Sequence, residues 1–226
     1  MNLLLYGIVE WSTHPPDEGG SPLSGVGLDD EPLHALVEGS LAAIVSDHAG
    51  ADPEPAIDSL RGYESTVRGL MERDAILPAR FGTVLPSEGA VRSLLRRRRR
   101  DLLLRVRRVR GAVELALRAN WRAGAGMLPG ARPPSGTSYL RERLELRQSA
   151  RRVASELDPL AALARSSRQT ISPAPDLPVL YAYLVERERV REFVAMVAQL
   201  DDTLDDVELI CTGPGPPYSF AEGAAV

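Results

Sequence analysis

The chain has 226 residues, 44% hydrophobic and 26% charged, values typical of a globular protein with one large domain or two small ones. Its net charge of −4 disfavours a general nucleic-acid binder, and no apolar run approaches the roughly 20 residues that a membrane helix needs. The single cysteine, Cys211, excludes an internal disulfide and a multi-cysteine metal site. Since the N-terminus also lacks a signal peptide's basic region, we expect a cytoplasmic protein.

The first 74 residues predict two buried strands and one amphipathic helix. Apolar runs of strand length cover residues 2–10 and 41–46. We expect a loop over 11–30 and a short helix over 33–38 between them. A helix over 58–74 places on one stripe Leu60, Tyr63, Val67, Leu70 and Met71.

Residues 76–86 predict a strand, because apolar residues alternate and Pro78 and Pro86 lie near its ends. Arg80 and Gly82 would then share one face, beside Phe81 on the other. In one interpretation this is a core strand with a solvated arginine. In the other, Gly82 lets another backbone approach closely and Arg80 anchors it.

A helix beginning after the N-cap Ser87 carries an arginine block, whereas residues 10–58 contain acids and no arginine. Its apolar stripe is formed by Val91, Leu94, Leu95, Leu102, Val106 and Val109. Arg98 points into this stripe. Either it runs along the edge of the core while the other arginines are solvated, or the block forms a basic face that docks an acidic partner surface. A nucleic-acid role for residues 96–100 lacks interleaved aromatic side chains.

After a boundary near Gly111, the pattern β-α-β-α-β predicts a ferredoxin-like sheet with helices on one face. Its elements are a strand over 112–121, a long helix over 139–164 that Pro159 kinks or divides, a central strand over 179–185, a helix near 187–200, an acidic turn over 201–206 and a strand over 207–212. The long helix has a stripe that includes Leu140, Leu144, Ala150, Val153 and Leu157. Proline-containing or glycine-containing links over 122–138 and 172–178 separate these elements.

The C-terminal segment over 213–220 contains three prolines, which cannot donate to a sheet ladder. It predicts a rigid extended strap, polyproline-like around Pro216 and Pro217, that ends with Tyr218 and Phe220. The strap either packs on its own protein or serves as a peptide-like ligand for another subunit.

Residues 3–9, 77–83 and 212–220 together resemble the GvpL/GvpF family of gas vesicle proteins, in order and over the whole chain. The resemblance implies an α+β protein with two domains. These are an N-terminal α+β domain (1–110) and a ferredoxin-like domain (111–212), followed by a Pro-rich tail (213–226). It also implies a minor gas vesicle component that acts with the hydrophobic shell protein GvpA during assembly. The family tail usually reads Gly-Pro-Trp-Pro-Pro-Tyr, and Gly215 stands at the tryptophan position. If that tryptophan packs the tail or grips a partner, this chain does so less tightly.

No catalytic motif accompanies this resemblance. His14, His34 and His48 lack metal-ligand spacing, and the aspartates of the acidic turn lack the glycine and glutamate of a calcium loop. We therefore expect no catalytic residue, metal or cofactor.

The leading hypothesis is a non-enzymatic assembly protein of cytoplasmic gas vesicles. It would bind GvpA and other gas vesicle accessory proteins, limit premature aggregation of GvpA, and bind neither nucleic acid nor membrane. The candidate partner-binding or structural anchor residues are Arg80, Phe81, Gly82, Pro217, Tyr218 and Phe220. The alternatives are a small-ligand-binding regulator or enzyme built on the ferredoxin-like domain, and an RNA or DNA binder that uses residues 96–100.

Overall fold

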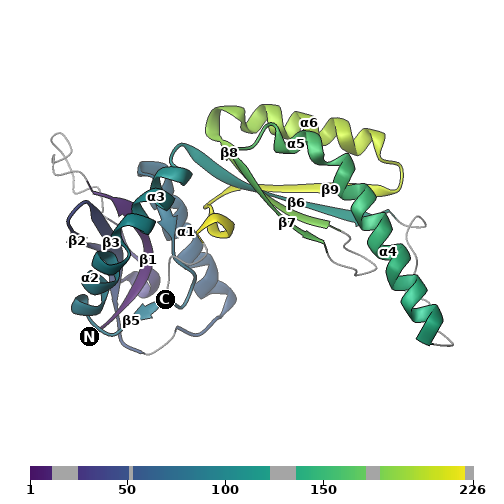
Figure 1. Ribbon diagram of the computed structural model, residues 1–226. Coiled ribbons are helices and arrows are strands. Elements are labelled where there is room, and N and C mark those ends of the chain that lie inside the picture. The colour runs from purple at the N-terminus through teal and green to yellow at the C-terminus, as the bar shows by residue number, and fades with distance from the viewer. Residues whose placement is uncertain (12–24, 51–52, 123–135, 172–178, 222–226) are drawn as a thin grey trace. The chain divides into compact units, whose positions relative to one another are not determined.

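The computed structural model describes residues 1–11, 25–50, 53–122, 136–171 and 179–221 (Figure 1). The chain is an α+β protein with two antiparallel sheets, which confirms the predicted class. It divides into two compact units: unit 1 comprises residues 1–111 with the segment from Pro216, and unit 2 comprises residues 112–215. Most of the predicted loop over 11–30, the loop over 122–138 and the link over 172–178 lie outside the described residues. Among the helices of the described residues, none combines the length and apolarity that crossing a membrane requires.

The sheet of unit 1 is organised around β1 (Asn2–Glu10), which is buried from Leu3 to Val9. Its strand order is β2-β3-β1-β4, and β5 also pairs with β1. The other strands are β2 (His34–Glu38), β3 (Leu41–His48), β4 (Ile76–Pro78) and β5 (Val84–Leu85). A continuous apolar run suits β1 because both of its faces are covered.

The two strands predicted in the first 46 residues are confirmed as β1 and β3, but the helix predicted over 33–38 is wrong. That segment is β2, which pairs antiparallel with β3. Only two residues separate the strands, and Gly39 among them has a φ of +62°. A left-handed glycine in a two-residue loop favours a tight hairpin, and this long-range pairing overrides the helical pattern.

The single strand predicted over 76–86 is also wrong, because a turn separates β4 from β5. Gly82 has a φ of +81°, a conformation that favours glycine. The amide of Thr83 donates to the carbonyl oxygen of Arg80 over 3.1 Å, and the Thr83 hydroxyl donates to the same oxygen over 2.7 Å. Arg80 and Gly82 therefore lie in a turn and do not share a strand face.

Three helices of unit 1 follow the predicted amphipathic patterns, with two corrections. They are α1 (Ile57–Arg73), α2 (Glu88–Arg97) and α3 (Arg99–Val109). The predicted N-cap is confirmed, since Ser87 Oγ accepts the amide of Ala90 over 3.2 Å. Leu60 is 41% exposed although its stripe predicted burial. The predicted single arginine-rich helix is interrupted at Arg98, where α2 ends and α3 begins. The Arg98 guanidinium donates to Asp101 over 2.6 Å.

Unit 2 has the strand order β7-β8-β6-β9, with every neighbouring pair antiparallel. The strands are β6 (Ala112–Trp121), β7 (Ser166–Ile171), β8 (Val179–Glu186) and β9 (Val207–Gly215). The predicted central position of β8 is confirmed, because it lies between β6 and β7. The sequence pattern does not predict β7, whose polar residues occupy a sheet edge. β9 extends to Gly215, so the first three residues of the predicted tail belong to this strand.

Helices α4 (Gly136–Glu156), α5 (Asp158–Ala161) and α6 (Val190–Thr203) cover one face of this sheet (Figure 1). Pro159 lies in the first turn of α5, which confirms that it divides the long predicted helix. The side chain of Tyr139 lies outside the described residues. The prediction that Leu140 and Leu144 are buried is wrong, since they are 68% and 56% exposed. The buried side chains described on α4 come later in the helix, at Ala150, Val153 and Ala154.

Candidate functional site

Tyr63 on α1 connects three segments of unit 1 that are far apart in the sequence. Its hydroxyl lies 2.7 Å from the carbonyl oxygen of Leu5 on β1 and 3.0 Å from that of Ala79 after β4. Its ring stacks on Tyr6 at 4.9 Å and meets the ring of Phe81 edge-on at 5.4 Å. The side chain is 2% exposed, so these contacts fix α1 against the sheet.

The buried surroundings of this tyrosine keep it protonated. Burial raises the pKa of the Tyr63 hydroxyl far above its ordinary value, and Tyr218 and Tyr6 raise it further. Of the predicted anchor residues, Phe81 contacts this side chain directly through its ring.

The remaining predicted anchor residues differ in exposure. Pro217 and Phe220 are buried, whereas Arg80 is exposed. An added Cβ on Gly82 would meet nothing within 4 Å, so the turn requires glycine here because of its positive φ and not because another backbone approaches. Tyr218–Phe220 forms the short 3-10 helix η3 in place of the predicted extended strap.

Tyr6 holds a second segment against the sheet. Its hydroxyl accepts the amide of Leu28 over 2.7 Å and lies 3.1 Å from Ser46 Oγ. Burial raises the pKa of this hydroxyl as well. The segment around Leu28 consequently lies beside α1. No local pattern in the sequence predicts this contact.

A groove of about 350 Å³ lies between that segment and α1. One wall contains Val26 and Leu33, and the other is formed by the small α1 residues Gly62, Ser65, Thr66 and Gly69. Its described lining includes one charged side chain, Arg73, and no histidine, carboxylate or cysteine. Such a surface suits the docking of apolar groups better than acid-base chemistry.

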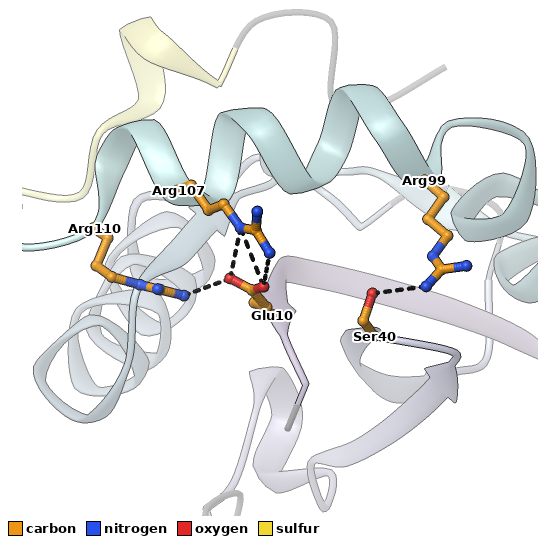
Figure 2. A network of polar contacts seen from close by, with 5 residues as sticks. All are labelled: Glu10, Ser40, Arg99, Arg107 and Arg110. Atoms are coloured by element: carbon orange, nitrogen blue, oxygen red, sulfur yellow. Dashed lines mark hydrogen bonds and ion pairs between the residues drawn. The ribbon is translucent and has the colours of Figure 1, made fainter. Parts of the chain in front are cut away.

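The arginine block binds the strand ends of its own unit (Figure 2). Arg107 donates to Glu10, the last residue of β1, with a shortest contact of 2.5 Å, and Arg110 donates to the same carboxylate over 2.6 Å. The hydrogen bond from Arg107 is the largest cause of the lowered pKa of Glu10. Arg99 reaches Ser40 Oγ over 3.3 Å, in the turn between β2 and β3.

Two arginines of α2 extend this pattern along β2. Arg96 donates to the Glu38 carboxylate over 3.0 Å, and Arg92 donates to the carbonyl oxygen of Val37 over 2.6 Å. The arginines on this side of the helices thus hold α2 and α3 to the sheet. Sequence periodicity identifies the helix faces but not these partners, which only the fold brings close.

In unit 2, a carboxylate of the predicted acidic turn accepts hydrogen bonds from within the chain. The Asp201 carboxylate accepts from Arg122 over 3.0 Å and from the amide of Leu209 over 2.8 Å. Within the described ranges, no group of three metal-ligating side chains comes together. Cys211 is half-buried, and burial raises the pKa of its thiol, which disfavours the reactive thiolate.

Comparison with known proteins identifies one family. A family model described as gas vesicle synthesis protein GvpL/GvpF matches residues 2–222. The chain is 30% identical to gas vesicle protein F of Streptomyces sp. (strain CB03234), over 98% of this chain and 100% of that protein. It is also 30% identical to gas vesicle protein L of the same strain, over 91% and 89%.

Two crystal structures share the fold. GvpF from Anabaena sp. PCC7120 superimposes with a TM-score of 0.77 at 21% identity, covering 98% of this chain and 96% of that one. GvpF from Microcystis aeruginosa gives a TM-score of 0.76 at 21% identity, covering 98% and 99%.

Proposed function

Because the chain belongs to the GvpL/GvpF family of gas vesicle synthesis proteins, we propose that it is a non-enzymatic assembly protein that binds the shell protein GvpA. Family membership itself gives the chain a gas vesicle-related role. In the proposed action, the protein covers apolar surface of GvpA before the shell forms, since apolar patches above roughly a few hundred Å² drive association. It would act in the cytoplasm at growing gas vesicles, with other accessory proteins as further partners.

The observation that carries this proposal is the groove along α1. A glycine inside a helix costs about 1 kcal/mol relative to alanine, yet Gly62 and Gly69 both lie in α1 and line the groove. An added Cβ at Gly69 would meet nothing within 4 Å, so the packing of unit 1 does not require glycine there. The space it leaves would allow a partner's backbone to approach the helix closely.

Exposed apolar side chains near the groove support the same proposal. Val26 in its wall is 56% exposed, and Leu33 adds a second apolar side chain to the lining. Burying such side chains against an apolar segment of a partner is favourable. The predicted anchor residue Phe81 would then act indirectly, since its ring holds α1 in place through Tyr63.

We also propose that unit 2 is a ferredoxin-like domain. Its elements follow the order β-α-β-β-α-β when α4 and α5 are taken as one helical layer. Its first strand, β6, lies between the last strand and the third, which is the arrangement of that fold. This assignment supports the proposed boundary near Gly111 between the two domains, whereas β9 moves the start of the tail from Gly213 to Pro216.

A copurification experiment with matched variants tests GvpA binding. Tagged full-length chain is coexpressed with GvpA, and GvpA that copurifies from the supernatant is quantified. The wild type should retain GvpA, and Gly69→Ala should retain less, because its methyl group takes up part of the space that glycine leaves open. Gly69→Leu should fill the groove and reduce the GvpA recovered at least tenfold. No GvpA with the wild type, together with unchanged vesicle yield on deletion of the gene, would refute the proposal.

A further inference from the structure

We propose that a second surface, on the outer side of α2 and α3, docks an acidic amphipathic helix of another protein in gas vesicle assembly. This surface, here called the basic ridge, is formed by Arg97, Arg100, Leu104 and Arg108. The inference goes beyond the proposed binding of GvpA, because it concerns a different partner and different residues from the groove on α1.

Most arginines of the block either hold the helices to the sheet or bind a carboxylate within the helices. Arg92, Arg96, Arg99, Arg107 and Arg110 contact β1, β2 or the turn after β2. Arg98 and Arg105 both donate to Asp101, within the helices themselves. Arg97 and Arg100 take part in neither task. Arg97 contacts Ser93 O of its own helix at 3.4 Å, and Arg100 makes no hydrogen bond or ion pair with any described residue.

The ridge residues are all exposed. Arg100, Leu104 and Arg108 recur every four residues along α3, which places them along one line on its surface, and Arg97 ends α2 just before the interruption at Arg98. The buried residues of α3, Leu102, Val106 and Val109, occupy other positions of the helical repeat. Leu104 is 62% exposed, so the ridge presents one apolar side chain among three guanidinium groups.

The chemistry of the ridge favours a protein helix as its occupant. Arg97 and Arg100 make no ion pair with a described residue, and carboxylates spaced three or four residues apart on a partner helix would neutralise them. The exposed Leu104 would gain by contact with an apolar side chain on the same helix. Arginine is enriched at protein interfaces because its guanidinium group binds carboxylates and loses its hydration easily. RNA supplies the charge but no aliphatic partner, and the ridge has no aromatic side chain on which bases stack.

Binding of a labelled peptide to the full-length chain tests this inference. The probe is a synthetic helical peptide with glutamates and one leucine on a single stripe, measured by fluorescence anisotropy. Its control is the same peptide with glutamine in place of each glutamate. We expect the acidic peptide to bind and to weaken as NaCl rises, and the glutamine peptide to bind at least tenfold more weakly.

Variants of the chain identify the surface. The double variant R97E/R100E should lose at least tenfold in affinity for the acidic peptide, and L104S should lose severalfold. Arg191→Glu is a matched control, because Arg191 is exposed on α6 and makes no hydrogen bond or ion pair with a described residue. It should leave binding unchanged. A peptide with lysine in place of each glutamate should bind R97E/R100E better than the wild type.

Three outcomes would overturn the inference. They are equal binding of the acidic and glutamine peptides, unchanged binding by a folded R97E/R100E variant, and displacement of the peptide by oligouridine RNA or anionic vesicles that bind more tightly. Thermal unfolding of each variant verifies that it is folded. The test is separate from that of the proposed function, since R97E/R100E should still retain GvpA and Gly69→Leu should still bind the acidic peptide.

Discussion

The hydroxyl of Tyr63 on α1 lies 2.7 Å from the carbonyl oxygen of Leu5 on β1. This contact joins the central strand of unit 1 to the helix that lines the groove. Carbonyl oxygens of the segment after β4 lie close to the same hydroxyl, at 3.0 Å for Ala79 and 3.4 Å for Arg80. The phenol has one proton to donate, which the oxygens of Leu5 and Ala79 share, with Leu5 the nearer.

We predict that Tyr63→Phe destabilises unit 1 by about 1–3 kcal/mol, since buried carbonyl oxygens would lose their hydrogen-bond donor. Urea unfolding followed by fluorescence and circular dichroism measures the loss. Tyr183→Phe is the matched control, because the Tyr183 hydroxyl is buried without a hydrogen-bond partner. Removing that hydroxyl should leave stability unchanged or raise it. Equal losses in both variants would contradict the assigned role of Tyr63.

We predict that the ion pairs of Glu10 make the stability of unit 1 depend on pH. Arg107 and Arg110 hold the pKa of Glu10 below its ordinary value, so the folded state favours the ionised carboxylate. The resulting stability is present above the unfolded pKa of about 4.3 and is lost as the pH falls through the folded pKa. Glu10→Gln should therefore lower the free energy of unfolding at pH 7 by less than about 1 kcal/mol, seen as a lower urea midpoint. Near pH 2 the variant and the wild type should have the same stability.

The control for this experiment is Glu208→Gln. Glu208 is exposed on β9 and makes no hydrogen bond or ion pair with a described residue. Its substitution should not change the pH dependence. A difference between Glu10→Gln and wild type that persists unchanged to pH 2 would show that packing, and not charge, is responsible.

Local periodicity predicts the elements that bury one side or both. The apolar run of β1 and the stripe of Tyr63, Val67 and Leu70 on α1 each report burial directly, because side chains alternate along strands and recur every three or four residues on helices. Residues 76–86 alternate in the same way, although Phe81 and Gly82 lie in a turn. The positive φ of Gly82 allows this turn, and the apolar pattern does not predict that φ.

Contacts that join distant segments leave no local pattern. Tyr6 and Phe81 both belong to stretches that the sequence singles out, but their meeting at Tyr63 depends on the fold. The same holds for the arginine block, in which periodicity separates helix faces but cannot supply Glu10 or Glu38 as partners. β7 escapes prediction for a different reason, since the polar residues of an edge strand lack an apolar alternation.

We predict opposite effects of alanine at two glycines of unit 1. An added Cβ at Gly7 on β1 would lie 2.5 Å from Ile76 Cγ1 and 2.8 Å from the carbonyl oxygen of Leu77. Gly7→Ala should therefore destabilise by about 1–3 kcal/mol through overpacking. Gly69→Ala should stabilise α1 by about 1 kcal/mol, because its Cβ meets open space. Urea unfolding of both variants decides the point, and destabilisation by Gly69→Ala would show that own-chain packing requires that glycine.

The last prediction concerns Gly215, which ends β9 where the family tail usually carries tryptophan. An added Cβ at Gly215 would meet nothing within 4 Å, and its φ is not left-handed, so the backbone accepts a side chain there. Because Pro216, Pro217 and Phe220 are already buried without it, Gly215→Trp should fold with unchanged or higher thermal stability. Gly213→Trp is the contrasting variant, since its φ is +118° and its Cβ would lie 2.7 Å from the carbonyl oxygen of Glu114. It should lower the unfolding temperature, and a comparable loss in Gly215→Trp would show that the tail requires glycine at both positions.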